Sequence, residues 1–294
     1  MSSQGLVAAK DQVKRLKRQD AFFWILGLLT LTLALVTLLS LIVDMAMTGW
    51  PRITSSFFFS FPSRFPEKAG IYSAWVGSVC VMFITAFLAI PLGIATGVFL
   101  EEYAKKNILT QLIEINILNL AGIPSITYGL MALGFFVYKM HLGQSLLTAG
   151  LTLGLLILPI IIVTTREAIR TIPSHIREAS YSLGATKWQT VWSHILPYSS
   201  GGIMTGVVIA LSRAIGETAP LITVGALTFI AFLPSSVMDP YTVMPIQMFN
   251  WVSRPQEEFH VNAAAAGLVL LSMTLFLNAA AIYIRYKFRK KYKW

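Results

Sequence analysis

The stretch Glu178–Pro197, EASYSLGATKWQTVWSHILP, is a polar interruption in a largely apolar chain. Gly184 is a helix-stop signal, because glycine accepts the left-handed conformation in which many helices end. Thr186 and Gln189 follow with the T-x-x-Q spacing of a capping box, which starts a new helix. Pro197 is expected to end or bend that second helix. The stretch therefore predicts two short helices joined at a glycine corner, with Ser174 as N-cap of the first.

The sequence around this stretch has the composition of an integral membrane protein. Of its 294 residues, 55% are hydrophobic and 12% are charged, whereas soluble domains carry about 25% charged residues. An apolar run of roughly 20 residues is long enough to cross a bilayer as a helix. We expect an all-α fold with six transmembrane helices, at about residues 21–43, 72–100, 109–137, 144–165, 199–232 and 261–284.

Lysine and arginine are distributed unequally between the connections on the two sides. The connections on one side hold 17 of these residues, and those on the other side hold 5. Since cytoplasmic connections are enriched in lysine and arginine, both termini are expected in the cytoplasm. The expected parts are a cytoplasmic segment 1–20, a first transmembrane helix 21–43, an external loop 44–71, a five-helix core 72–284 with a cytoplasmic loop 166–198, and a basic cytoplasmic tail 285–294.

Two terminal features have specific interpretations. The apolar run 21–43 exceeds the core of a signal peptide and lacks a small-residue cleavage site after it, so a retained anchor is expected. The tail RYKFRKKYKW, residues 285–294, is interpreted as a topology anchor at the lipid surface rather than a nucleic-acid contact.

Charge also occurs inside an apolar run, at Arg213 and Glu217 within residues 210–225, ALSRAIGETAPLITVG. An arginine in mid-span costs about 2.5–3.5 kcal/mol on insertion scales. Residues four apart share a helix face, so the two charges can neutralise each other. Pro220 is expected to bend or open this helix near Gly216, and broken helices recur at the substrate sites of transporters. We therefore expect the pair to face the protein interior or a pathway, with Gly206 and Ala210 on the same stripe.

The charge pair has two interpretations that stay open at this stage. It can be a structural ion pair that locks two helices together, or a substrate contact or gate. Arginine suits an oxyanion because its planar fork donates two parallel hydrogen bonds. A neighbouring glutamate accepts a hydrogen bond from an anion that carries a proton and repels one that does not. Thr218 is a third candidate pathway residue, and Pro124 is expected to kink the third span, either along the pathway or only for packing.

The signature of the opening stretch resembles that of ABC importer permeases. The family pattern is Glu-Ala-Ala, three residues, Gly, nine residues, Ile, one residue, Leu-Pro, and it falls here on Glu178, Ala179, Ser180, Gly184, His194, Leu196 and Pro197. Ser180 stands where the pattern has its second alanine, and His194 stands where it has isoleucine. Residues 122–130, GIPSITYGL, and 213–220, RAIGETAP, resemble segments of phosphate importer permeases and look most like their PstA-type subunit.

This resemblance implies a fold, a place and a set of partners. The fold would be that of a type I ABC importer permease in the bacterial inner membrane, and the cargo inorganic phosphate. Molybdate, tungstate or sulfate is the alternative cargo. The loop would seat in a cytoplasmic ATPase, with Glu178, Ala179 and Gly184 at the contact. The implied partners are a second homologous permease (PstC-type), two copies of an ATP-binding subunit (PstB-type), a phosphate-binding protein (PstS-type) and membrane lipid, but no nucleic acid.

Other functional classes find little support in the sequence. It has no Walker-type G-x-x-x-x-G-K-[ST] pattern, so ATP and Mg²⁺ are expected in the partner ATPase and no cofactor on this chain. No nucleophile–base pair or paired carboxylates lie at catalytic spacing, and four scattered histidines make no metal site. We therefore expect a transport subunit rather than an enzyme. A membrane partner without a pathway stays open as an alternative.

Overall fold

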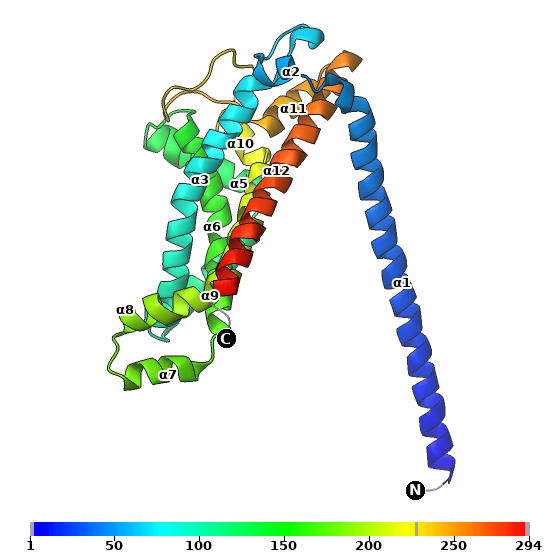
Figure 1. The fold of residues 1–294 in the computed structure, drawn as a ribbon, viewed down its shortest axis with the longest axis vertical. Helices are drawn as coiled ribbons and strands as arrows, with labels where there is room; N and C mark the ends of the chain where they lie inside the picture. Colours follow the sequence, from blue (N-terminus) through cyan, green and yellow to red (C-terminus); the bar gives the residue numbers. More distant parts are fainter. Residues whose placement is uncertain (1–2, 227–228, 292–294) are drawn as a thin grey trace.

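The computed structural model describes residues 3–226 and 229–291, and every regular element within them is a helix (Figure 1). Five segments are long and apolar enough to cross a membrane: Lys14–Arg52, Tyr72–Tyr103, Leu146–Arg170, Lys187–Ile215 and Glu257–Lys287. A sixth crossing is made if the bent pair Ile108–Ala121 and Ser125–Lys139 is one span, with an angle of 106° between its halves. Five of the six predicted spans therefore overlap long apolar helices, and the third overlaps the bent pair.

The first helix, α1 (Ser3–Gly49), stands apart from the other helices over most of its length (Figure 1). The most apolar part of α1 is not buried against the rest of the chain, as expected for a helix surrounded by lipid or by another subunit. Only its last turns reach α12 (Glu257–Lys291). There the backbones touch, because a side-chain carbon on Gly49 would lie 2.5 Å from the backbone nitrogen of Ala265.

The core forms where α3 (Tyr72–Val98) and α9 (Leu196–Ile215) pack on α6 (Leu146–Arg170). Small residues allow this close approach, as is typical of helices packed in membranes. A side-chain carbon on Gly93 would lie 2.6 Å from Ile161 Cγ2, and one on Gly202 would lie 2.6 Å from Ala168 Cβ. The main hydrophobic cluster fills this three-helix junction, with α6 at its centre.

The two ends of the bundle differ. The end where α1 begins and α12 ends, called the terminal end here, also carries α7 (Ser174–Ser182) and α8 (Lys187–Thr190) (Figure 1). The other end, called the loop end, carries α2 (Ser55–Phe59) and α11 (Met244–Val252). That the terminal end faces the cytoplasm stays a prediction from the lysine and arginine count.

The loop end is an ordered cap rather than a plain loop. Besides α2 it contains two short 3₁₀ helices, η1 (Trp50–Arg52) and η2 (Pro66–Lys68). Arg52 joins them, because its guanidinium donates to Asn262 Oδ1 at 2.8 Å and to the carbonyl oxygens of Pro66, Glu67 and Ala69. The predicted external loop 44–71 therefore begins inside α1 and folds back onto α12.

The fifth span predicted over residues 199–232 is interrupted near Gly216, as expected, but its predicted extent beyond Thr223 is wrong. Helix α9 ends at Ile215, and the separate turn of helix α10 (Ala219–Thr223) follows. Pro220 lies in the first turn of α10, where a proline is tolerated, and Gly225 has a φ of +88°. The apolar residues after α10 are not helical among those described, and 227 and 228 lie outside the described residues.

The predicted cytoplasmic loop 166–198 is also shorter than expected. Helix α6 continues to Arg170, and α8 continues through the π-helical turn η5 (Val191–Ile195) into α9 as one segment. Pro197 therefore does not end the second short helix, so the first of its two predicted effects is wrong and the bend stays a prediction. Proline removes one helical hydrogen bond and crowds the preceding turn, and that preceding turn is the wider π turn η5.

Candidate functional site

The predicted charge pair forms at the break that ends α9. Arg213 lies in the last turn of α9, and Glu217 follows Gly216, which caps it. The Nε of Arg213 lies 3.2 Å from Oε1 of Glu217, and the two side chains are 40% and 16% exposed in the isolated chain. The pairing and the helix break near Gly216 are confirmed. The break begins before Pro220, which belongs to the next helix.

The pair lies near the middle of the bundle. Gly202 packs opposite Ala168, and Gly206 opposite Thr164, so α9 and α6 run antiparallel in a fixed register. Continuing this register places Arg213 level with about residue 157, midway along α6. The prediction of one stripe for all four residues is only partly right, because Gly206 and Ala210 are buried whereas Arg213 is exposed.

A second helix break lies against the first. Helix α4 (Ile108–Ala121) ends at Gly122, and α5 (Ser125–Ala132) begins directly after Pro124. The hydroxyl of Tyr128 donates to the Leu120 carbonyl at 2.8 Å across this break, and α5, which holds Tyr128, packs on α10 (Ala219–Thr223), the helix that follows Glu217. The kink predicted at Pro124 is therefore present, and it belongs to the surroundings of the charge pair.

The two broken segments pack without room for a side chain. A carbon on Gly129 of α5 would lie 2.6 Å from Cα of Pro220 in α10, which is closer than packed atoms come. Thr218 lies within the first break, at the N-cap of α10, and is partly exposed, with its hydroxyl 3.4 Å from the Gly216 carbonyl oxygen. The predicted pathway residues Arg213, Glu217 and Thr218 are thus brought together with both predicted kink residues, Pro124 and Pro220.

The glycine corner at the terminal end is confirmed in its details. Helix α7 is followed by Gly184 with a φ of +80°. Thr186 and Gln189 form a reciprocal capping box at the start of α8. The predicted N-cap is wrong by one residue, because Ser174 is the first helical residue and Pro173 occupies the cap position without a side-chain bond.

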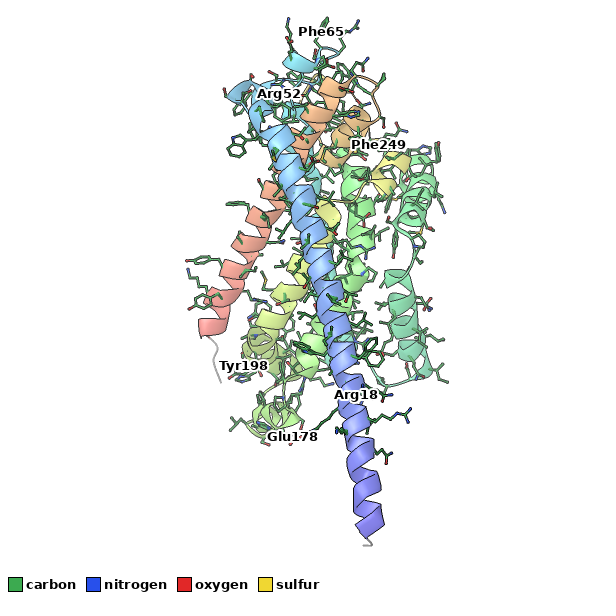
Figure 2. The ribbon with its side chains drawn as sticks, turned by 90° about the vertical axis from the view of Figure 1, so that its right-hand side faces the viewer. Arg18, Arg52, Phe65, Glu178, Tyr198 and Phe249 are labelled. Carbon is green, nitrogen blue, oxygen red and sulfur yellow. The ribbon has the colours of Figure 1, made fainter. Side chains whose placement is uncertain are left out.

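The residues of the signature have different environments in this corner. Ser180 is buried and hydrogen-bonded to Thr190 at 2.8 Å, whereas Glu178 and Ala179 are exposed on α7. Leu196 packs partly into the core, and Pro197 lies in the first turn of α9. Glu178 projects at the terminal end, far from Arg52 at the loop end (Figure 2).

Large apolar side chains gather on the exposed surface around the corner. Leu183 is 89% exposed, and the stacked rings of Trp188 and Trp192 are 64% and 63% exposed. Exposed leucine and tryptophan at the end of a membrane bundle indicate a contact with another protein or with lipid headgroups. Ile176 of α7, by contrast, packs inward against the cluster that contains Val191 and Ile195.

The sequence reasoning missed the acidic pair that holds this corner. Glu101 and Glu102 lie in the π-helical turn η3 (Phe99–Tyr103), which continues α3. Glu102 is 7% exposed and pairs with Arg177 of α7 at 2.7 Å. The available signal was two adjacent carboxylates at the end of an apolar span on a side rich in lysine and arginine. No cluster of potential metal ligands occurs among residues 3–226 and 229–291.

Comparison with known proteins identifies the family. The sequence pattern of the family described as "Binding-protein-dependent transport system inner membrane component" matches residues 89–293. The phosphate transport system permease protein PstA 1 of Mycobacterium tuberculosis is 30% identical over 86% of this chain and 84% of its own. PstA of Xylella fastidiosa is 32% identical, covering 81% and 83%, and the probable PstA of Methanocaldococcus jannaschii is 30% identical, covering 97% and 98%.

The fold has solved counterparts. A chain of the MetNI methionine ABC transporter, described in inward-facing conformations, superposes with a TM-score of 0.59 at 19% identity, over 72% of this chain and 93% of that one. At this identity the likeness concerns the fold alone, which is that of a type I ABC importer permease. With its matching sequence pattern and its PstA relatives, the chain belongs to the family of binding-protein-dependent transport system inner membrane components.

Proposed function

We propose that this chain is the PstA-type permease subunit of an ABC importer that moves inorganic phosphate across the inner membrane. The names of the relatives support this assignment. The observation that carries it in the structure is the Arg213–Glu217 pair at a helix break midway through the bundle, with part of the arginine left open. A charged side chain in that position is costly, and binding of a transported anion would explain its presence there.

The chemistry of the pair favours an anion that still carries a proton. The planar guanidinium of Arg213 can donate two parallel hydrogen bonds to two oxygens of a tetrahedral oxyanion. The carboxylate of Glu217 can accept a hydrogen bond from a third, protonated oxygen. Phosphate near neutral pH keeps a proton, whereas sulfate is fully ionised and would be repelled by the carboxylate. The pair would therefore both bind phosphate and discriminate against sulfate.

The exposed corner between α7 and α8 is the proposed contact with the ATPase subunit. Leu183, Trp188 and Trp192 offer apolar surface, and Glu178 and Ala179 lie exposed beside them on α7. An apolar helix face seated in a groove is a common mode of protein recognition. ATP and Mg²⁺ would be bound by that partner, and this chain would bind no cofactor.

The remaining partners follow from the arrangement of the two ends. A second homologous permease (PstC-type) would complete the pathway on the side where Arg213 is exposed. Two copies of an ATP-binding subunit (PstB-type) would bind the terminal end, in the cytoplasm, and a phosphate-binding protein (PstS-type) would dock on the loop end. Lipid would surround the spans, among them the exposed α1. The excess of lysine and arginine at the terminal end supports this orientation.

ATP-driven uptake in vesicles tests the proposal. The assembled complex is reconstituted with its binding protein, and uptake of labelled phosphate is measured with ATP enclosed on the side of the terminal end. Unlabelled sulfate, molybdate and tungstate are added as competitors in separate arms. We expect saturable phosphate uptake that sulfate does not inhibit. Uptake of labelled molybdate, tungstate or sulfate in preference to phosphate would contradict the assignment and support the alternative oxyanion.

A further inference from the structure

We propose that Glu101 and Glu102 form a two-sided junction that transmits the position of the α7 helix to α4 and, through it, to the Arg213–Glu217 site. The two carboxylates are adjacent in the π-helical turn η3, yet their ion pairs lead to different parts of the bundle. The inference rests on the proposed function, because it assumes that α7 receives movement from an ATPase. It names positioning residues, which do not themselves contact the transported anion.

Glu102 faces the α7–α8 corner. Its Oε1 accepts from both Nε and Nη2 of Arg177, at 2.9 and 2.7 Å. The same guanidinium donates to the carbonyl oxygens of Ile169 and Ile172 at the end of α6. Lys187, at the start of α8, donates to the backbone carbonyl of Glu102 at 3.2 Å. Both short helices of the corner are therefore fixed to this one residue.

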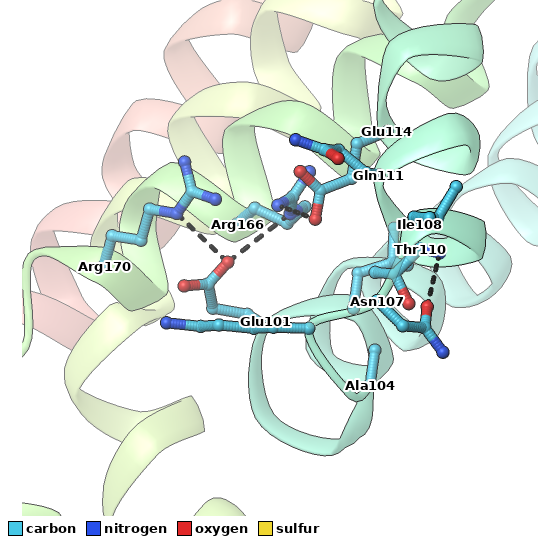
Figure 3. Close-up of a pocket in the computed structure, with 11 residues that line it drawn as sticks. Glu101, Ala104, Asn107, Ile108, Thr110, Gln111, Glu114, Arg166 and Arg170 are labelled. Carbon is cyan, nitrogen blue, oxygen red and sulfur yellow. Dashed lines mark hydrogen bonds and ion pairs between the residues drawn. The ribbon is translucent and has the colours of Figure 1, made fainter.

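Glu101 faces the opposite way, toward α6 and α4 (Figure 3). Its Oε2 lies 3.1 Å from Nε of Arg170 and 3.4 Å from Nε of Arg166. The Nη2 of Arg166 lies 2.7 Å from Oε1 of Glu114 on α4. Arg166 is only 9% exposed, so it is a largely buried arginine shared between two carboxylates. Such a group is costly to leave unpaired, so Arg166 links η3, α6 and α4 through its two carboxylate partners.

Helix α4 is well placed to move in response. Ile117 is its one buried residue in the isolated chain, and it packs in a small cluster with Leu100 and Ile162. A cavity of about 610 Å³ opens beside the network, between η3, the start of α4 and the end of α6 (Figure 3). Loss of the Arg166–Glu114 bond would leave α4 held by that small cluster and, at its far end, by the bond from Tyr128 to Leu120, with space next to its start.

The far end of α4 leads to the charge pair. It ends at the break before Pro124, which is bridged by the hydroxyl of Tyr128, and α5 then packs on α10 through Gly129. A displacement of α4 would therefore also shift α5 and α10, next to Arg213 and Glu217. Physical coupling of this kind needs contiguous elements with two arrangements, and a chain of contacts through η3, α6, α4 and α5 supplies the continuity.

The test is the number of anions transported per ATP hydrolysed in the reconstituted complex, measured together with the assembly of the subunits. We expect Glu102→Gln, Glu101→Gln and Glu114→Gln each to lower this ratio at least fivefold while ATP hydrolysis continues. Glu167→Gln is the matched control, because Glu167 is 63% exposed and pairs with Arg170 on the same helix. It should keep the ratio within about twofold of the unchanged protein, as exposed pairs contribute little.

Two further variants separate a relay from a simple loss of stability. The exchange Glu102→Arg with Arg177→Glu should recover more of the ratio than either single change, since the ion pair is restored with its ends reversed while the two carbonyl bonds of Arg177 are lost. Glu101→Gln combined with Glu102→Gln should be no worse than the more severe single change, because both interrupt one sequence of contacts. Unchanged ratios in Glu101→Gln and Glu114→Gln would overturn the proposal. So would additive losses, which indicate two independent structural roles.

These outcomes are distinct from failure of the proposed function. The ratio is measured with whichever oxyanion the unchanged complex carries. Should that be molybdate rather than phosphate, the cargo assignment fails and the relay is still decided by the same variants. If a glutamine variant does not assemble, the charge-exchanged pair decides the outcome: an assembled, coupled exchange variant supports the relay, and an assembled but uncoupled one overturns it.

Discussion

The hydroxyl oxygens of Ser180 and Thr190 lie 2.8 Å apart and join α7 to α8 beneath the glycine corner. Both residues are buried, although their neighbours on these helices are exposed to solvent. The bond holds the two helices at a fixed separation, so that the corner moves as a unit. Ser180 is also the residue that departs from the alanine of the family pattern.

The first prediction distinguishes the effect on transport of the side-chain size at Ser180 from the effect of its hydrogen bond. Ser180→Ala removes one bond, worth about 1 kcal/mol, and Thr190 keeps its bond to the Thr186 carbonyl. Transport by this variant should stay within about threefold of the unchanged protein. Ser180→Leu has no space and should push α7 away from α8, with loss of coupled uptake. Ser182→Leu, on the exposed side of α7, is the matched control, and uptake in vesicles is the measurement.

The second prediction concerns the backbone at Gly184. Its φ of +80° is strained for any residue with a side chain, and the space around it is open. Gly184→Val should therefore distort the corner through the backbone alone, at a cost of about 1–2 kcal/mol or more, and uncouple ATP hydrolysis from uptake. Gly184→Asn should be tolerated better, since asparagine accepts this conformation.

Gly201→Val provides the control for Gly184, because Gly201 also has open space around it but lies inside helix α9. Its φ is not positive, so the same side chain should be accepted there. ATPase activity and uptake are measured in one preparation. Normal phosphate uptake by Gly184→Val would contradict the requirement for a left-handed residue at the corner.

The third prediction concerns orientation in the membrane. Gln19 is exposed on α1 directly after Arg18, which lies toward the terminal end, and Phe65 lies exposed at the loop end (Figure 2). In a Cys80→Ser background, Gln19→Cys should react with a membrane-impermeant thiol reagent only after the cells are opened, and Phe65→Cys in intact cells. The reverse pattern would show that the terminal end is external.

The fourth prediction concerns pH and the loop-end turn around Asp239. Hydrogen bonds from the backbone amides of Ser236 and Ser235, and from the Ser235 hydroxyl, hold the pKa of the Asp239 carboxyl below its usual range. A lowered pKa means that the turn is fully stabilised above the ordinary carboxyl value of about 4 and loses this stabilisation as the pH falls through the lowered value.

Hydrogen exchange of the segment 235–239 in the solubilised complex measures this dependence. After correction for the intrinsic effect of pH, protection should be constant above about pH 4 and should fall at lower pH. Asp239→Asn has no carboxylate, so its protection should be lower and independent of pH over this interval. A pH-dependent loss in the asparagine variant would assign the titration to another group.

The extent to which the sequence predicts this molecule depends on the range of the interaction. The capping box at Thr186 and the corner at Gly184 were predicted because their signals lie within four residues of chain. Apolar length also predicted α3 and α6. It failed after Ile215, because the apolar residues beyond α10 are equally suited to an extended segment packed against other helices. An apolar run indicates that a segment is buried, but it does not say whether the backbone hydrogen bonds are those of a helix or of an extended segment.

The candidate site was predictable for a similar reason. Arg213 and Glu217 are four residues apart, and two opposite charges at this spacing in an apolar run are visible in the local sequence. The bond from Arg177 to Glu102 joins residues 75 positions apart, and the approach of Gly129 to Pro220 depends on two separate helix breaks. Contacts of this kind depend on how whole helices pack together, and the local patterns of a single sequence do not predict that packing.

The last prediction concerns the charge pair itself. Arg213→Gln should abolish phosphate uptake while the subunits still assemble, because a mid-span arginine opposes insertion and its loss should not harm it. Arg213→Lys keeps the charge but loses the planar fork, and a large loss of uptake is expected. Glu217→Gln keeps the arginine and removes the repulsion of ionised anions. Some phosphate uptake should then remain, with weaker discrimination against sulfate.

The double variant Arg213→Gln with Glu217→Gln distinguishes the two interpretations of the pair. If the residues only lock α9 to the turn that follows it, each single change strands one charge and the double change strands none, so the double variant should transport better than either single one. If Arg213 contacts the anion, the double variant should transport as little as Arg213→Gln. Co-purification of the subunits confirms assembly in each case, and competition with sulfate is measured alongside uptake. Recovery of phosphate uptake in the double variant would exclude the substrate contact and leave the helix lock.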